Sequence, residues 1–174
     1  MPNQRNKRPN ESPMPDALAY FLTWTTYGTW LPGDERGWVK RGKGPQLAEF
    51  QTKRGAESRM TEKPCFLSEE QRKIVEQTSQ RHCEIRGWDL LAVNCRSNHV
   101  HAVVAANASP ETVRDQLKAW CTRKLKEQQL SARVELRENW WTERGSQRYI
   151  GDNESLQATI SYVDVAQDRK DRDV

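Results

Sequence analysis

Two histidines separated by one valine are the residues of this chain best suited to chemistry. His99 and His101 stand in the segment Asn98-His99-Val100-His101-Ala102, and the whole sequence contains only 3 histidines. The apolar residues that follow predict a buried strand. Because successive side chains of a strand point to opposite faces, both imidazoles should lie on one face and Val100 on the other. This arrangement predicts a metal site, although two hydrogen-bonded polar residues at a strand end would give the same pattern.

The C-terminal helix could supply a further ligand and a nucleophile. Asp152-Asn153-Glu154 predicts its start, and the helical pattern runs from Ser155 to about Lys170. One face of this helix is expected to carry Leu156, Ile160, Val163 and Gln167. Gln167 is unusual on a packed face, and its amide oxygen could bind a metal ion, unless it is simply a hydrated residue near the helix end. Tyr162 flanks the same face, where a phenol either packs at the rim or acts as a nucleophile.

Seven predicted elements would position these residues. In chain order they are a strand over 18–27, a helix over 68–86, strands over 88–95 and 98–105, a helix from 109, a strand over 139–150 with a turn at 145–146, and the final helix. This order begins with the ferredoxin-like split βαβ pattern. The sequence therefore predicts an α+β fold with a four-stranded antiparallel sheet, two helices on one face, and a C-terminal helix that carries the tyrosine.

The first two helices have strong start signals. Ser68 and Gln71 form a capping-box pattern, and Gly87 follows the last predicted turn of that helix. Ser109 and Pro110 supply a cap and a proline at the first helical position of the next helix. These signals predict the helix starts independently of the hydrophobic pattern.

The helix that begins after Ser109 is expected to have two distinct surfaces. Its buried stripe consists of Val113, Leu117, Trp120, Cys121 and Leu125. Its exposed surface is basic and consists of Arg114, Lys118, Arg123, Lys124 and Lys126. Charged residues on a helix surface usually serve solvation, but the excess of one sign favours contact with DNA phosphates.

A long polar segment and several tryptophans could also contact nucleic acid. Residues 39–64 contain many basic residues and are predicted to be a loop insertion, either an arm that contacts phosphates or a solvated insertion. The tryptophans near predicted strand ends are Trp30, Trp38, Trp140 and Trp141. Each of them could stack on an unpaired base or pack in the core.

Length and composition suit one mildly basic domain. The chain has 174 residues and a formal net charge of +4. We expect residues 1–16 to be a disordered lead-in, residues 17–170 to form the domain and residues 171–174 to be a charged tail. No stretch of about 18 apolar residues and no secretory signal pattern is present, so no membrane span is expected. Four cysteines without a C-x-x-C pattern favour a reducing cytoplasm.

Taken together, these residues resemble a known family. Asn98-His99-Val100-His101 resembles the HUH motif (histidine, hydrophobic residue, histidine) of single-tyrosine nucleases, and Tyr162 looks like their nucleophile. The predicted split βαβ order is similar to their ferredoxin-like fold. Between Leu18 and Gln167 the chain resembles the REP-associated tyrosine transposases, which are relatives of the small single-tyrosine insertion-sequence transposases.

The resemblance implies an activity, a cofactor and a partner. A member of this family would cut and rejoin hairpin-bearing single-stranded DNA through a 5′-phosphotyrosine on Tyr162, with Mg²⁺ or Mn²⁺ held by His99, His101 and a third ligand. It would work in the cytoplasm, associated with the prokaryotic nucleoid when bound to DNA, as a monomer or a homodimer. The DNA contacts are expected from Arg114, Lys118, Arg123, Trp30 and Trp38.

One position departs from the pattern of the family. In well-studied relatives the third metal ligand lies one helical turn after the tyrosine, and here that position is Ala166. Gln167 or Asp164 would have to replace it, and a π-bulge after Tyr162 would bring Gln167 closer to the tyrosine. Without a third ligand the chain would be a catalytically silent protein that binds DNA hairpins, which is the alternative function.

Overall fold

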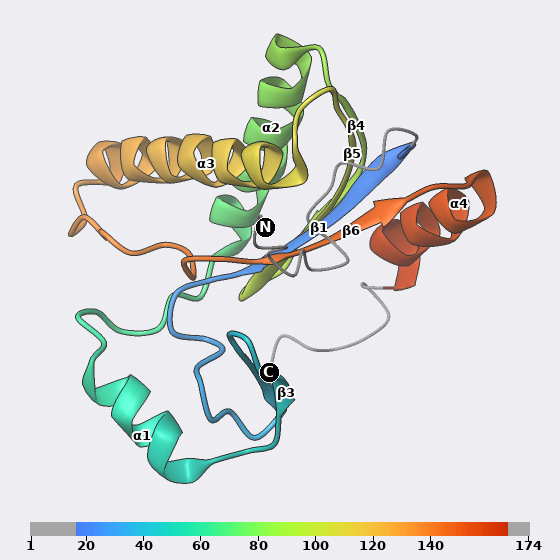
Figure 1. The fold of residues 1–174 in the computed structure, drawn as a ribbon. Helices are drawn as coiled ribbons and strands as arrows, with labels where there is room; N and C mark the ends of the chain where they lie inside the picture. Colours follow the sequence, from blue (N-terminus) through green and yellow to red (C-terminus); the bar gives the residue numbers. More distant parts are fainter. Residues whose placement is uncertain (1–16, 167–174) are drawn as a thin grey trace, which may run out of the picture.

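A four-stranded antiparallel sheet with helices on both faces forms the core of the molecule (Figure 1). The structure is a computed structural model, and it describes residues 17–166. The strand order is β4-β5-β1-β6, with β1 (Ala19–Thr25), β4 (Asp89–Cys95), β5 (His99–Ala105) and β6 (Ser146–Ile150). Two helices, α2 (Glu69–Arg86) and α3 (Pro110–Ala132), cover one face. The predicted α+β ferredoxin-like fold is thus confirmed.

The C-terminal segment covers the opposite face of the sheet. It consists of α4 (Asn153–Ser161) and a short π-helix, η1 (Tyr162–Ala166). Side chains of β5 alternate between two cores: Val100 and Ala102 pack in the larger core with α2 and α3, whereas Val103 packs in the smaller core with α4 and η1. The same alternation places the side chains of His99 and His101 on the face of the smaller core, as predicted.

The predicted helix starts are confirmed. In α2 the Ser68 side chain accepts a hydrogen bond from the Gln71 amide at 3.2 Å, and the Gln71 side chain accepts one from the Ser68 amide at 3.0 Å. Gly87 ends α2 in the left-handed region with φ 66°, where glycine is favoured. Ser109 caps α3 by accepting from the Thr112 amide at 3.2 Å. In residues 17–166 no helix is both long and apolar enough to cross a membrane.

The predicted surfaces of α3 are only partly correct. The expected stripe includes four fully buried residues, namely Val113, Leu117, Cys121 and Leu125. Trp120, however, is 40% exposed and does not belong to the stripe. Arg114 and Lys118 were expected on the exposed basic surface, but they are only 8% and 9% exposed. Their long side chains reach a turn of the chain that supplies hydrogen-bond acceptors, which the helical pattern by itself does not reveal.

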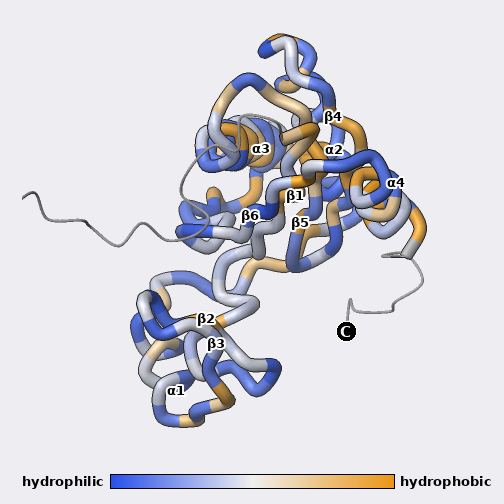
Figure 2. Tube along the Cα trace, turned by 45° about the vertical axis from the view of Figure 1, so that its right-hand side comes forward, coloured by the Kyte–Doolittle hydropathy of each residue, from blue (hydrophilic) through white to orange (hydrophobic). Residues whose placement is uncertain are grey.

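A lobe made of residues 28–67 projects from one end of the sheet (Figure 1). The segment 39–64 was predicted to be a loop, but most of it belongs to short regular elements. These are β2 (Trp38–Lys40), β3 (Gly44–Gln46) and α1 (Phe50–Ser58). The two strands have only 3 residues each, and α1 buries only Ala56, so the hydrophobic pattern of these elements is weak. Figure 2 shows a largely hydrophilic lobe beside a sheet with many hydrophobic residues.

The last strand of the sheet is shorter than predicted. β6 begins at Ser146, and upstream of it Trp141 forms only an isolated bridge with Thr26. Trp140 is 2% exposed and packs in the larger core. Trp141 packs edge-on against Trp24 with ring centroids 6.3 Å apart. These two tryptophans therefore serve packing rather than the base stacking considered from the sequence.

Candidate active site

His99 and His101 lie side by side on the face of β5 that the C-terminal segment covers. Their ring centroids are 4.8 Å apart. His101 is in register with Thr23 of β1 and with Asn94 of β4, whereas His99 begins the strand opposite Thr25. Neighbouring strands thus hold the backbone of His101 on both sides, and its side chain is almost buried while that of His99 is half-buried.

Each histidine ring is oriented by a hydrogen bond at the same nitrogen. Nδ1 of His101 lies 2.8 Å from Thr23 Oγ1, and Nδ1 of His99 lies 2.6 Å from Asn98 Oδ1. Because an amide oxygen only accepts, the Asn98 contact places the proton of His99 on Nδ1 and the lone pair on Nε2. Metal-binding imidazoles are commonly held in this way, by a bond at the nitrogen that does not bind the ion.

The environment of His101 keeps its ring uncharged. Burial, and to a smaller extent the neighbouring His99, lower the pKa of His101 to about 4. Phe21 stacks on the ring with centroids 5.4 Å apart and an interplanar angle of 21°, which contributes to the burial. At neutral pH the imidazole is therefore neutral, which is the form that binds metal ions.

Tyr162 approaches the histidines from the C-terminal segment. Its ring centroid lies 5.9 Å from that of His101 and 6.2 Å from that of Phe21. The predicted helix does not continue in α form through this residue, because Tyr162 is the first residue of the π-helix η1. A π-helical segment is thus present where the sequence suggested a π-bulge.

The residues around Tyr162 anchor it to the sheet. The next side chain, Val163, is fully buried in the smaller core, and its carbonyl accepts a hydrogen bond from Asn94 Nδ2 at 3.1 Å. Asn94 is also the register partner of His101. One residue of β4 therefore connects the histidine strand with the segment that carries the tyrosine.

Several residues of the site have no motif that marks them in the sequence. Thr23 and Phe21 contact His101, and the Arg148 guanidinium lies 5.4 Å from the centre of the Phe21 ring while donating to Thr159 Oγ1 at 3.0 Å. The alternation of β1 places Phe21 and Thr23 on one face. Only the register with β5 identifies that face as the one with the histidines.

Only one of the two candidate third ligands, Asp164, lies within the residues that the structure describes. Gln167 lies outside residues 17–166. Asp164 is exposed on η1. Within the described part of the chain, no group of three His, Cys, Asp or Glu side chains comes together around a possible ion. The described site therefore consists of two imidazoles and one phenol.

The expected DNA-binding residues lie on two parts of the molecule, the lobe and α3. Trp30 and Trp38 belong to the lobe, where their indole N–H groups donate to backbone carbonyls at 2.7 and 3.0 Å. Trp30 is 45% exposed. Arg123 lies on the outer surface of α3, with its guanidinium 5.3 Å from the centre of the Trp120 ring.

Arg114 and Lys118 organise the turn before β6. Lys118 Nζ donates to the carbonyls of Thr142, Glu143 and Arg144 at 2.6, 3.2 and 3.3 Å. Burial lowers the pKa of Lys118 to about 8. Arg114 donates to the Gln147 side chain at 3.1 Å. Both side chains are buried, so the expectation that they lie on the exposed surface of the helix is wrong.

Sequence comparison assigns the chain to a family. The model of the family described as "Transposase IS200 like" matches residues 59–165, which is more than half of the chain. The chain therefore belongs to the IS200-like transposase family, and its role is that of a DNA transposase. No curated protein sequence matches it significantly.

A solved structure agrees with this assignment in its fold. A REP-associated tyrosine transposase bound to a REP hairpin matches with a TM-score of 0.51 and 10% sequence identity, over 88% of this chain and 68% of that chain. A protein from Deinococcus radiodurans R1, provisionally described as a transposase, matches with a TM-score of 0.48 and 14% identity, over 91% of this chain and 92% of its own. The first match has the same fold, and the resemblance to REP-associated tyrosine transposases is confirmed.

Proposed function

We propose that this transposase is a metal-dependent endonuclease and strand transferase that acts on hairpin-bearing single-stranded DNA, with Tyr162 as its nucleophile. The observation that carries this proposal is the meeting of a phenol and two imidazoles on one face of the sheet. Tyr162 lies 5.9 Å from His101, and His101 lies 4.8 Å from His99, measured between ring centroids. These three residues come from two elements far apart in the sequence, which argues against a chance cluster of neighbours.

In the proposed reaction the Oη atom of Tyr162 attacks the scissile phosphorus. A bond between this oxygen and phosphorus forms while the bond from phosphorus to the 3′ oxygen breaks, which leaves a 5′-phosphotyrosine and a 3′-hydroxyl. The phenol loses its proton and the departing 3′ oxygen gains one, so the overall proton count is unchanged. Since one phosphodiester replaces another, a 3′-hydroxyl can reverse the step and rejoin a strand without a nucleoside triphosphate.

His99 and His101 are the residues that would hold the divalent ion, Mg²⁺ or Mn²⁺. The neutral state of His101 and the Nδ1 hydrogen bonds of both rings fit this role. When bound, the ion would act as a Lewis acid on the scissile phosphate. Imidazole ligands suit Mn²⁺ better than Mg²⁺.

For the third ligand we favour Gln167, with Asp164 as the other candidate. The π-helical winding of η1 (Tyr162–Ala166) is compatible with Gln167, because a π-helix pairs each residue with the fifth residue along the chain rather than the fourth. The alanine at position 166 is then no obstacle to metal binding.

The substrate proposal rests on the fold neighbour and on the charge of the chain. The similar REP-associated tyrosine transposase is described as bound to a REP hairpin. The net charge of +4 is compatible with a DNA partner. Arg123, Trp30 and Trp38 are proposed DNA contacts, and Arg114 and Lys118, which are buried against the turn before β6, would contact DNA only if that turn moved. A monomer and a homodimer are both compatible with this proposal.

A covalent-adduct assay tests the proposed nucleophile. Wild-type protein is incubated with Mn²⁺ and labelled hairpin oligonucleotides with single-stranded flanks, and the adduct is detected on a denaturing gel. We expect an adduct that disappears in Tyr162→Phe and persists in Tyr149→Phe, a matched control because Tyr149 packs edge-on against Tyr20 on the other face. An adduct that survives Tyr162→Phe would contradict the proposal.

The same assay distinguishes the third ligands and the alternative function. Loss of the adduct in Gln167→Ala but not in Asp164→Ala would assign Gln167 as a ligand, and the reverse would assign Asp164. Hairpin binding without an adduct, in wild-type protein with either Mg²⁺ or Mn²⁺, would instead favour the catalytically silent hairpin-binding protein.

A further inference from the structure

A cavity of about 370 Å³ lies between the lobe and the histidine end of the sheet. Its lining includes Arg36, Lys53 and Phe66 from the lobe and Asn98 from the turn before β5. Asn98 is also the residue whose side chain holds His99 Nδ1 at 2.6 Å. The cavity therefore shares a wall with the candidate active site, and its volume is within the range of small-ligand sites.

The two positive charges in this cavity are already neutralised. Asp34 is only 4% exposed, and its carboxylate accepts hydrogen bonds from Arg36 Nε at 2.7 Å and from Arg36 Nη2 at 2.9 Å. Lys53 Nζ lies 3.8 Å from the same carboxylate. These contacts, with those to Arg36 first, lower the pKa of Asp34 and keep it ionised. A phosphate would thus meet cations that are engaged with a buried anion.

Two further carboxylates supply hydrogen-bond acceptors to the cavity. Glu35 and Glu57 line it and are exposed. Neither side chain forms an ion pair or a hydrogen bond with another residue of 17–166. Carboxylates of this kind accept hydrogen bonds from the amino groups of bases, as in contacts with the N4 amino group of cytosine. These exposed carboxylates favour an amino-bearing base over a phosphate.

Apolar side chains also line the cavity. Met60, Pro64 and Phe66 line the cavity, and the Phe66 side chain is 64% exposed although it is large and aromatic. Gly28 belongs to the same lining with φ +74°, and a Cβ atom at Gly28 would clash with Met60 and crowd Pro64. An exposed aromatic ring beside hydrogen-bond acceptors is the combination that binds an unpaired base by stacking and by its edge.

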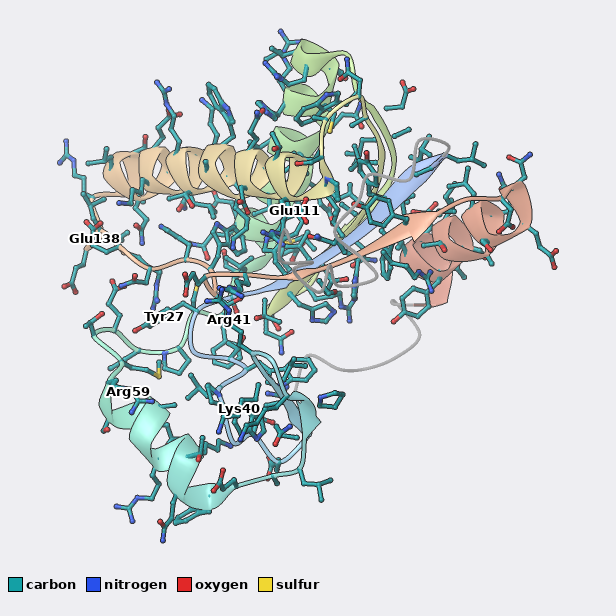
Figure 3. All side chains as sticks on the ribbon, in the orientation of Figure 1. Tyr27, Lys40, Arg41, Arg59, Glu111 and Glu138 are labelled. Atoms are coloured by element: carbon teal, nitrogen blue, oxygen red, sulfur yellow. The ribbon has the colours of Figure 1, made fainter. Side chains whose placement is uncertain are left out.

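The cavity is held in place by hydrogen bonds between the lobe and the sheet. The Cys65 amide donates to the Tyr27 carbonyl at 2.8 Å, and the Thr61 amide donates to Tyr27 Oη at 3.0 Å. The Leu67 amide donates to the Ser97 carbonyl at 2.7 Å, directly before Asn98. Figure 3 labels Tyr27 where the lobe joins the sheet. The wall that carries Phe66 is thus fixed relative to the histidine strand.

We propose that this cavity binds one unpaired, amino-bearing base of the DNA strand next to the scissile phosphate. The proposal rests on the proposed function, since it places the base beside a phosphate held at His99 and His101. Phe66 would stack on the base, and Glu35 and Glu57 would accept from its amino group. The family match begins at residue 59, so Phe66 and Asn98 lie inside it, whereas Glu35 and Glu57 precede it.

Binding measurements on a protein that cannot react test this proposal. The probes are labelled hairpin oligonucleotides whose single-stranded flanks are all dA, all dC, all dT or abasic, and fluorescence anisotropy is measured with Tyr162→Phe. We expect dA and dC flanks to bind about tenfold more tightly than abasic flanks, and more tightly than dT flanks. Adding the Phe66→Ala substitution should weaken the affinity for dA and dC flanks about tenfold. Adding Glu35→Ala and Glu57→Ala, which removes both acceptors, should abolish the preference over dT.

Matched variants on the same lobe separate the cavity from general DNA attraction. Phe50→Ala removes an aromatic ring that is 71% exposed and lies outside the cavity lining, and it should leave base preference unchanged. Lys40→Gln, at the hairpin position labelled in Figure 3, should weaken binding of all four flanks equally. Flanks that bind alike, or a preference that survives the Phe66 and glutamate substitutions, would overturn the proposal.

The adduct assay keeps the two proposals apart. A wild-type adduct that forms equally with all four flanks would overturn the base-binding cavity and leave the nuclease intact. A base preference in the binding assay without any wild-type adduct would support the cavity and contradict the proposed nuclease.

Discussion

The sheet and the lobe of this transposase are built by different physical means. The sheet is held by two apolar cores, and its histidines stand on a strand with hydrogen-bonded neighbours on both sides. The lobe buries few large side chains besides Leu67, which packs with Cys65 in the larger core, and polar contacts hold Asp34 and Glu62. This difference means that the residues of the candidate site are fixed mainly by burial, whereas the neighbouring cavity depends more on hydrogen bonds and ion pairs.

Truncating a core residue should have the largest effect on stability. Leu117 is fully buried between α3 and the sheet, so Leu117→Ala should lower the free energy of unfolding by about 2–5 kcal/mol. Leu47→Ala in the lobe removes a side chain that is 90% exposed, and we expect a change within about 0.5 kcal/mol. Urea denaturation measures both. Equal losses would mean that the lobe is as much a part of the apolar core as α3.

Acidification should weaken the sheet region through His101. Its pKa in the folded protein is about 4, below the ordinary value, so between pH of about 6.5 and 4 the unfolded chain binds more protons and stability falls as pH falls. The full contribution is about 3 kcal/mol. The contribution of His101 is the difference between the pH dependence of stability in wild type and in His101→Asn, measured by denaturation. Carboxylates titrate in both proteins, so their effect cancels in this difference. A difference between the two that does not change with pH would show that His101 is not protected from protonation.

Removing the hydroxyl that orients His101 should affect the metal more than the fold. Thr23 Oγ1 lies 2.8 Å from His101 Nδ1, so Thr23→Val should lower Mn²⁺ affinity and adduct formation by about 10- to 100-fold. Thr52→Val in the lobe breaks only an exposed hydrogen bond to Glu49 and should change neither quantity. Calorimetric titration with Mn²⁺ provides the affinity. An unchanged Mn²⁺ affinity in Thr23→Val would show that Thr23 does not support metal binding by His101.

The smallest expected effect is a local loosening of the lobe. The Glu62 carboxylate accepts from the amides of Glu138 and Asn139 at 2.9 and 2.6 Å, and from Asn139 Nδ2 at 2.8 Å. Glu62→Ala should cost about 1 kcal/mol and raise amide exchange at Asn139 while β5 stays protected. Hydrogen-exchange mass spectrometry follows both segments. If β5 also loses protection, the junction and the sheet form one cooperative unit.

The sequence was sufficient where a residue's environment depends on its own element. The period of a strand predicts that His99 and His101 share a face, and the cap residues Ser68 and Ser109 predict where helices begin. Both predictions are confirmed. These features need no knowledge of which distant segment packs nearby.

Features that depend on a distant partner were not predictable. On a helical wheel Lys118 is expected at the surface. In the structure its ammonium group is buried and donates hydrogen bonds to three carbonyls of the turn before β6. Thr23 becomes part of the site only through the register of β1 with β5. The short elements of the lobe escaped prediction because β2, β3 and α1 bury almost nothing. The roles of Tyr162, His99 and His101 in the reaction remain proposals.

The hydrogen bond from the Cys65 amide to the Tyr27 carbonyl, 2.8 Å long, has a consequence for how this protein can change. It means that the chain leaves the sheet and returns to it at the same place. A segment with adjacent ends can be lengthened, shortened or exchanged with little effect on the strands that flank it. We therefore expect the segment between Tyr27 and Cys65 to tolerate changes of length and sequence better than the strands that it joins.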